Sequence, residues 1–330
     1  MRGKTAGHTA GQGSGAGGRG RRAPALGIAA LGAALALTAG AVTPAAAGTT
    51  GTGLGSHAPG HGSHAPGHPG YGHYTALGDS YTSGPLIPTQ VDAACERSDH
   101  DYPSLVTAAG AARRLDDVSC GGATTVQMRQ AQGANPPQLD AVRRDTDLVT
   151  LQIGGNDIGF GSIISTCASL GATAPAGDPC ERHYTSGGTD QLAGAVRATA
   201  PKVAAVLRAV RERAPHASVV VVGYPDLLPD RGPGCFPTVP FAAGDVAYLR
   251  STEKRLNAML EAEALLHGAR YADTYTPTVG HDMCRPEGVR WIEPLVPAAP
   301  AAPAHPNAQG ERVMAHVVQE RLGSPVLSGW

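Results

Sequence analysis

Three short apolar runs constrain the fold of this chain more than any other feature, because each stops at a cluster of turn-forming residues. The runs cover 75–77, 147–153 and 218–223, and the first two end at Gly78-Asp79-Ser80 and Gly154-Gly155-Asn156-Asp157. Unbroken runs of Val, Ile and Leu are typical of strands buried on both faces of a parallel sheet. In open α/β sheets the site lies beyond the carboxyl ends of the strands. These clusters are therefore the expected place for chemistry.

Helical patterns separate the apolar runs. Apolar residues recur at helical spacing over 190–213 and 246–266, and a last helix is predicted over 307–322 with Asn307 as its N-cap. Alternating strands and helices predict an α/β domain with a mostly parallel sheet. Residues 157–189 and 224–243 are rich in Gly and Pro and are predicted to be long loops.

The first 47 residues have the pattern of an export signal. Arg21 and Arg22 precede the uncharged run 25–42, and small residues up to Ala47 offer a cleavage site. A permanent membrane anchor is the alternative, but a run made mostly of Ala and Gly is weakly apolar for a span. Because of the arginine pair, export by the twin-arginine route remains an alternative to export by the general secretory route.

Residues 48–73 are predicted to be a disordered spacer, because they hold Gly, His, Pro, Ser and Thr and almost nothing to bury. A metal-binding tract is the alternative interpretation. Its candidate ligands are His57, His61, His64, His68 and His73. The folded domain is predicted to occupy 74–330.

All 6 cysteines follow the predicted signal, so disulfides are expected in an oxidising compartment. No Cys-x-x-Cys pair occurs, which argues against a zinc site. Six cysteines allow about fifteen pairings. Local pairing would join Cys95 to Cys120, Cys167 to Cys180 and Cys235 to Cys284.

Four polar blocks carry the candidate chemistry. They are Gly78-Asp-Ser80, Cys120-Gly-Gly122, Gly154-Gly-Asn156-Asp157 and His305-Pro-Asn307. A serine hydroxyl needs an adjacent base to act as a nucleophile. Ser80 is not in a Gly-x-Ser-x-Gly elbow, because no glycine lies two residues after it. In this order the four blocks resemble those of the SGNH hydrolases, also called GDSL lipases and esterases.

The resemblance covers about 74–325 and is closest to secreted actinobacterial lipases. It implies a three-layer α/β/α sandwich with a flavodoxin-like, mostly parallel sheet, and the local cysteine pairing given above. It implies that Ser80 is the nucleophile and His305 the base, and that Gly122 and Asn156 form the oxyanion hole. No metal or other cofactor is implied.

The chain departs from the family pattern at Ala302, where most members have the aspartate that orients the histidine. We therefore predict a Ser80–His305 dyad in which the backbone carbonyl of Ala302 or Pro303 accepts from Nδ1. Glu293 is the alternative orienting acid, and His281 beside Asp282 is the alternative base. Asp79 is interpreted as a turn residue, and Asp157 as a tie within its loop.

The leading functional hypothesis is a secreted lipase or esterase that cleaves fatty-acyl esters. An esterase for plant-polymer or carbohydrate esters is the second, and a secreted His-rich metal-binding protein is the third. A net charge of −1 shows no excess of basic residues, which argues against nucleic-acid binding. A monomer that does not stay in the membrane after signal cleavage is expected. A neutral histidine base predicts activity that falls below roughly pH 6–7.

Overall fold

The three apolar runs form neighbouring strands of one parallel sheet. The computed structural model describes residues 70–323, so the predicted signal and most of the predicted spacer lie outside it. The sheet has five strands in the order β4-β1-β5-β6-β7, and every adjacent pair is parallel. Its strands are β1 (Tyr74–Gly78), β4 (Leu115–Asp117), β5 (Leu148–Gln152), β6 (Ser218–Val222) and β7 (Arg270–Ala272). This is the flavodoxin-like order that the resemblance implied.

The strand order places the topological switch between β1 and β5. The chain leaves β1 for the edge strand β4 on one side and then crosses back to β5 on the other. The loops after these two strands diverge, and ligands bind in the crevice that such loops leave. Ser80 follows β1 and Asn156 follows β5, so both lie at this crevice.

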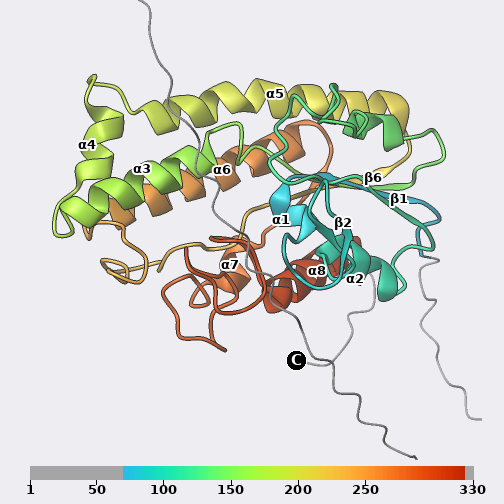
Figure 1. Ribbon diagram of the computed structural model, residues 1–330. Helices are drawn as coiled ribbons and strands as arrows, with labels where there is room; N and C mark the ends of the chain where they lie inside the picture. The colour runs from blue at the N-terminus through green and yellow to red at the C-terminus, as the bar shows by residue number, and fades with distance from the viewer. Residues whose placement is uncertain (1–69, 324–330) are drawn as a thin grey trace, which may run out of the picture. The chain divides into compact units, whose positions relative to one another are not determined.

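Helices cover both faces of the sheet and make three layers (Figure 1). One face packs against α5 (Gln191–Arg213) and α6 (Asp245–Leu266), and the other against α2 (Tyr102–Ala108) and α8 (Ala308–Leu322). Successive strand residues alternate between the two cores, as Leu148 and Val149 do. This two-sided burial explains why the strands are unbroken apolar runs, and it confirms the three-layer α/β/α prediction.

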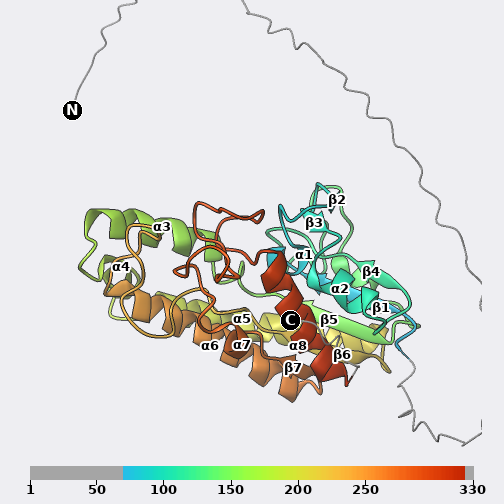
Figure 2. The ribbon, with the colours of Figure 1, turned by 90° about the horizontal axis from the view of Figure 1, so that it is seen from below.

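The three long helices lie where the sequence predicts them. Asp190 accepts from the amide of Ala193 and begins α5, and Asn307 accepts from the amides of Gln309 and Gly310 and begins α8. Figure 2 shows α8 crossing the sheet on the face opposite α5. Asn307 is therefore the N-cap that was predicted, and it follows His305 by two residues.

One predicted loop is wrong. Residues 157–189 contain α3 (Phe160–Thr173) and α4 (Pro179–Thr185). The apolar residues Phe160, Ile163, Ile164 and Cys167 have helical spacing on α3, and Ile163 and Cys167 are buried. Glycines in the segment hid this pattern. The second predicted loop, 224–243, holds no helix or strand.

The remaining elements are short. They are α1 (Ser80–Ser83), the 3₁₀ turn η1 (Gln138–Ala141), α7 (Tyr275–Thr278), and an antiparallel pair of β2 (Gln90–Asp92) with β3 (Arg97–Ser98).

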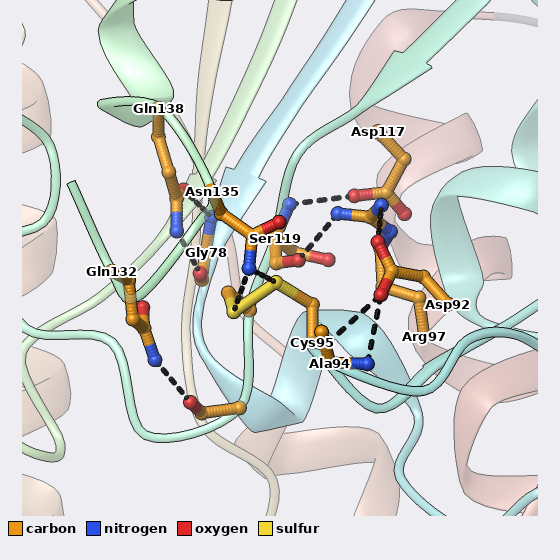
Figure 3. Close-up of a disulfide and its surroundings, with 12 residues drawn as sticks. Gly78, Asp92, Ala94, Cys95, Arg97, Asp117, Ser119, Gln132, Asn135 and Gln138 are labelled. Atoms are coloured by element: carbon orange, nitrogen blue, oxygen red, sulfur yellow. Dashed lines mark hydrogen bonds and ion pairs between the residues drawn. A yellow bond between two sulfur atoms is a disulfide. The ribbon is translucent and has the colours of Figure 1, made fainter.

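The six cysteines pair locally as Cys95–Cys120, Cys167–Cys180 and Cys235–Cys284. Figure 3 shows the first of these disulfides close to the end of β1 at Gly78. The first joins the turn between β2 and β3 to the loop after β4, the second joins α3 to α4, and the third joins the loop after β6 to the loop after α7.

The start of the fold includes residues that the sequence interpretation gave to the spacer. The amides of Gly72 and His73 donate to the Asp147 carboxylate, and His73 Nε2 lies 2.9 Å from Asp116 Oδ2. His73 is buried, so the fifth histidine of the tract is a packed residue of the domain. The other four histidines lie outside the described residues.

Candidate active site

Ser80 begins α1 immediately after β1. Asp79 caps this short helix, because its Oδ1 accepts from the amide of Tyr81 at 3.0 Å. Gly78 lets the first turn of α1 pack closely against the strand end, since a Cβ there would lie 2.1 Å from Thr82 Oγ1. The strand and the cap therefore hold the Ser80 hydroxyl at the edge of the sheet.

The His305 ring lies between Ser80 and a backbone carbonyl. Its Nε2 is 2.7 Å from Ser80 Oγ, and its Nδ1 is 2.8 Å from the carbonyl oxygen of Pro303. A carbonyl oxygen can only accept, so Nδ1 carries the proton and the Nε2 lone pair faces the serine hydroxyl. The ring is thus in the tautomer that can take a proton from Ser80.

The segment before His305 is held by contacts distant in sequence. Ala304 has a left-handed backbone with φ of 60°, and its carbonyl accepts from the Tyr81 hydroxyl at 2.6 Å. The Tyr81 ring also packs against the His305 ring, with centroids 4.7 Å apart. Tyr81 was not among the residues predicted from sequence. No local pattern marks it, because its partner lies more than two hundred residues along the chain.

The alternative partners of the histidine are engaged elsewhere. The Ala302 carbonyl accepts from the amide of His305 and not from its ring. The Glu293 carboxylate is buried and accepts from Asn307 Nδ2 and from the amides of Ala298 and Ala299. Burial by itself would raise the pKa of Glu293, but these hydrogen bonds and Arg290 hold it below its ordinary value.

The rival base, His281, has other partners as well. Its ring stacks on Trp291 with centroids 3.3 Å apart, and its Nδ1 faces the carbonyl of Val289. The Asp282 carboxylate accepts from the amide of Cys284. His281 and Asp282 therefore stabilise the loop between α7 and the segment before His305.

Gly122 and Asn156 reach the same groove from the loops after β4 and β5. Asn156 Nδ2 donates to the carbonyl of Ala123 at 3.0 Å, and Asp157 accepts from both the amide and the hydroxyl of Thr125. Asp157 thus ties its loop to the loop of Gly122. Among residues 70–323, the amides of Ser80 and Gly122 donate to no protein acceptor. Both amides remain available as donors.

A buried network joins the Ser80 turn to the Asn156 loop. The Tyr224 hydroxyl donates to Asp79 Oδ2 at 2.6 Å and accepts from the amide of Gly155 at 2.9 Å. Burial raises the pKa of Asp79 to about 7, although its hydrogen bonds oppose the shift. Asp79 therefore has the turn-forming contacts predicted for it, and Tyr224 is a further supporting residue that sequence did not reveal.

The comparisons with known proteins agree with this geometry. The model of the GDSL-like lipase/acylhydrolase family matches residues 76–313. The chain belongs to this family. It is 43% identical to lipase 2 of Streptomyces coelicolor over 258 residues, which cover 76% of this chain and 85% of the relative.

Solved structures show the same relationship. A phospholipase A1 from Streptomyces albidoflavus superimposes with a TM-score of 0.62, and an extracellular lipase from Streptomyces rimosus with 0.61. Each is 28% identical and is matched over 99% of its length by 76% of this chain. The chain is therefore a carboxylic ester hydrolase of the GDSL type.

The hydrolase has two spaces at Ser80. One is an apolar cavity of about 60 Å³, and the other is an open groove of about 320 Å³. His305 and Gly122 line only the groove, whereas Ser80 and Asn156 line both spaces. The cavity walls are mainly apolar and include Ile163, Tyr224, Leu228, Phe241, Leu249, Leu256 and Met283.

Burial also sets the charge state of this hydrolase's histidine. The loss of solvent lowers the pKa of His305 to about 4, and the Pro303 carbonyl offsets only part of that effect. Burial disfavours the imidazolium form. His305 is therefore neutral at neutral pH.

The described part of the hydrolase contains no helix long and apolar enough to cross a membrane. Within residues 70–323, no group of three or more His, Cys, Asp or Glu side chains is arranged to hold a metal ion.

Proposed function

We propose that this hydrolase cleaves fatty-acyl esters with a Ser80–His305 dyad and an acyl-enzyme intermediate. His305 Nε2 takes the proton of Ser80, and Oγ forms a bond to the ester carbonyl carbon. The bond to the alcohol oxygen then breaks, and the same Nε2 proton passes to the leaving alkoxide. Water hydrolyses the acyl-serine by the reverse roles. The observation that carries the proposal is the unbroken path from the Pro303 carbonyl through the His305 ring to Ser80 Oγ.

The amides of Ser80 and Gly122 and the side chain of Asn156 would hold the oxyanion. The first two donors have no protein acceptor among residues 70–323. Asn156 Nδ2 uses one of its two hydrogens on Ala123, so the second remains for the substrate. Such preorganised donors stabilise the charge that develops in the transition state.

The position of His305 indicates which of the two spaces holds the alcohol part of the ester and which holds the acyl part. The leaving oxygen must come close to Nε2 to receive its proton. Because His305 lines only the open groove, we assign the alcohol to the groove and the acyl chain to the apolar cavity. Burial raises the pKa of the cavity-lining Glu253 well above its ordinary value. A raised pKa favours the uncharged carboxyl group over the carboxylate.

Filling the cavity tests this assignment. Leu249→Phe adds volume to the cavity wall and should shorten the acyl chain that fits. We expect the ratio of kcat/KM for p-nitrophenyl octanoate to that for the butyrate to fall about tenfold, since each excluded methylene forfeits about 0.8 kcal/mol. Leu265→Phe, on the exposed side of the same helix, should leave the ratio unchanged. Equal loss for both esters in Leu249→Phe would contradict the assignment of the cavity.

The pH dependence tests the role of His305. Because the base must be neutral and its pKa is lowered to about 4, kcat/KM should stay level to about pH 5 and decline below about pH 4. This revises the limit of roughly pH 6–7 expected for an unperturbed histidine. Activity recovered on return to pH 7 separates titration from acid unfolding. Burial raises the pKa of Asp79 to about 7, so Asp79→Asn removes that group from the pH profile. A fall in kcat/KM near pH 6.5 that persists in this variant would contradict the role.

We also propose that the protein is exported. The predicted signal over 1–47 and three disulfides in the domain support this, because disulfides persist in oxidising compartments. The N-terminal sequence of the protein recovered from culture medium tests cleavage after Ala47.

A further inference from the structure

Glu96 places a carboxylate in the open groove. It lies between β2 and β3, is exposed, and lines the groove together with Ser80, Gly122, Asn156 and His305. Its backbone is left-handed, with φ of 54°. The carboxylate lies over Gly121, where an added Cβ would be 2.5 Å from Glu96 Oε2. The acidic group is thus beside the residue that precedes Gly122.

A covalent link holds Glu96 in this place. Cys95, its neighbour, forms the disulfide with Cys120, and the amide of Gly121 donates to the Cys95 carbonyl at 2.9 Å. Gln132 Nε2 also donates to the Gly121 carbonyl at 2.7 Å, and Figure 3 shows Gln132 and Asn135 beside the disulfide of Cys95. The turn that carries Glu96 and the loop that carries Gly122 are therefore joined as one wall of the groove.

The charge of Glu96 is not neutralised by the protein. Within residues 70–323, its side chain makes no hydrogen bond and no ion pair. The adjacent Arg97 is engaged with Asp92 and with the carbonyl of Ser119. The other residues that line the groove, apart from His305, carry no ionisable side chain. The groove therefore presents a single uncompensated negative charge.

We propose that Glu96 is a specificity-determining residue that selects esters whose alcohol part carries a positive charge, such as a quaternary ammonium. The proposal rests on the proposed function, because it needs the alcohol to occupy the groove. A cationic alcohol would approach the carboxylate while its ester oxygen faces His305. An anionic alcohol would be repelled by the same group.

Three esters that share the hexanoyl chain and differ in the charge of their alcohol part test the proposed selection by Glu96. Hexanoylcholine is cationic, 3,3-dimethylbutyl hexanoate is its neutral isostere, and 4-hexanoyloxybutyrate is anionic. In Glu96→Gln, the ratio of kcat/KM for the cationic ester to that for the neutral one should fall about two- to fivefold, the range that exposed charge pairs give. The ratio for the anionic ester should rise. Both changes should shrink in 1 M salt, which screens exposed charges.

Because each ratio compares two esters on the same variant, a smaller fraction of folded enzyme does not change it. Glu212→Gln, an exposed acidic residue of α5 outside the groove, should leave both ratios as in the wild type. Unchanged ratios in Glu96→Gln would overturn the charge selection and leave the ester hydrolase intact. If the wild type cleaves none of the three esters, the proposed function and the selection both fail.

Discussion

Ser80→Ala is expected to lower kcat for a soluble p-nitrophenyl ester by about 10⁴–10⁶, because among residues 70–323 no other hydroxyl contacts His305 Nε2. The residual rate would come from the oxyanion donors and from substrate binding. Ser80 is only half-buried, and alanine is a good helix former at the start of α1. The variant should therefore fold, and an unfolding curve close to that of the wild type would show this.

A covalent probe makes the Ser80 result specific. A p-nitrophenyl phosphonate should add one phosphonyl group to the wild type, detectable by mass spectrometry, and none to Ser80→Ala. Ser162→Ala is the matched control, since Ser162 is exposed on α3 and does not line the groove. It should keep the activity and the labelling of the wild type. A Ser80→Ala protein that is still labelled, or that keeps more than about 1% of kcat, would refute the nucleophile.

Asn156→Ala is expected to lower kcat by about 10²–10³ with little change in KM, because an oxyanion donor acts mainly in the transition state. The substitution also removes the 3.0 Å bond to Ala123, so a structural contribution has to be separated. Thr125→Val breaks the hydroxyl bond to Asp157 and loosens the same pair of loops. Its loss should be less than about tenfold, since no oxyanion donor is removed. Equal losses in the two variants would mean that Asn156 only holds the loops together.

Sequence patterns predicted the parts of the fold that repeat over several residues. The runs 147–153 and 218–223 contain β5 and β6, since a strand buried on both faces has to be apolar throughout. The edge strands β4 and β7 are three residues long and include charged residues, so no run marks them. On α3, glycines obscured an apolar spacing that was present.

The candidate site likewise has parts that local sequence patterns predicted and parts that they did not. The chain order of Ser80, Gly122, Asn156 and His305 carried the family resemblance, and the strand ends indicated where they meet. Sequence left both Ala302 and Pro303 as candidate orienting carbonyls. Pro303 has the contact because Ala304 is left-handed and bonded to Tyr81, an arrangement no local pattern encodes.

The sequence by itself determined the buried strands β1, β5 and β6, the three long helices and the candidate site residues, because those signals are local periodicities and short ordered blocks. Only the tertiary structure decided the partner of His305, the lowered pKa of its ring and the presence of Glu96 in the groove. Each of these depends on segments that are distant along the chain and meet at the carboxyl ends of parallel strands. The burial of the ring and the contacts of its partners depend on many long-range contacts, and these form only when the sheet has formed.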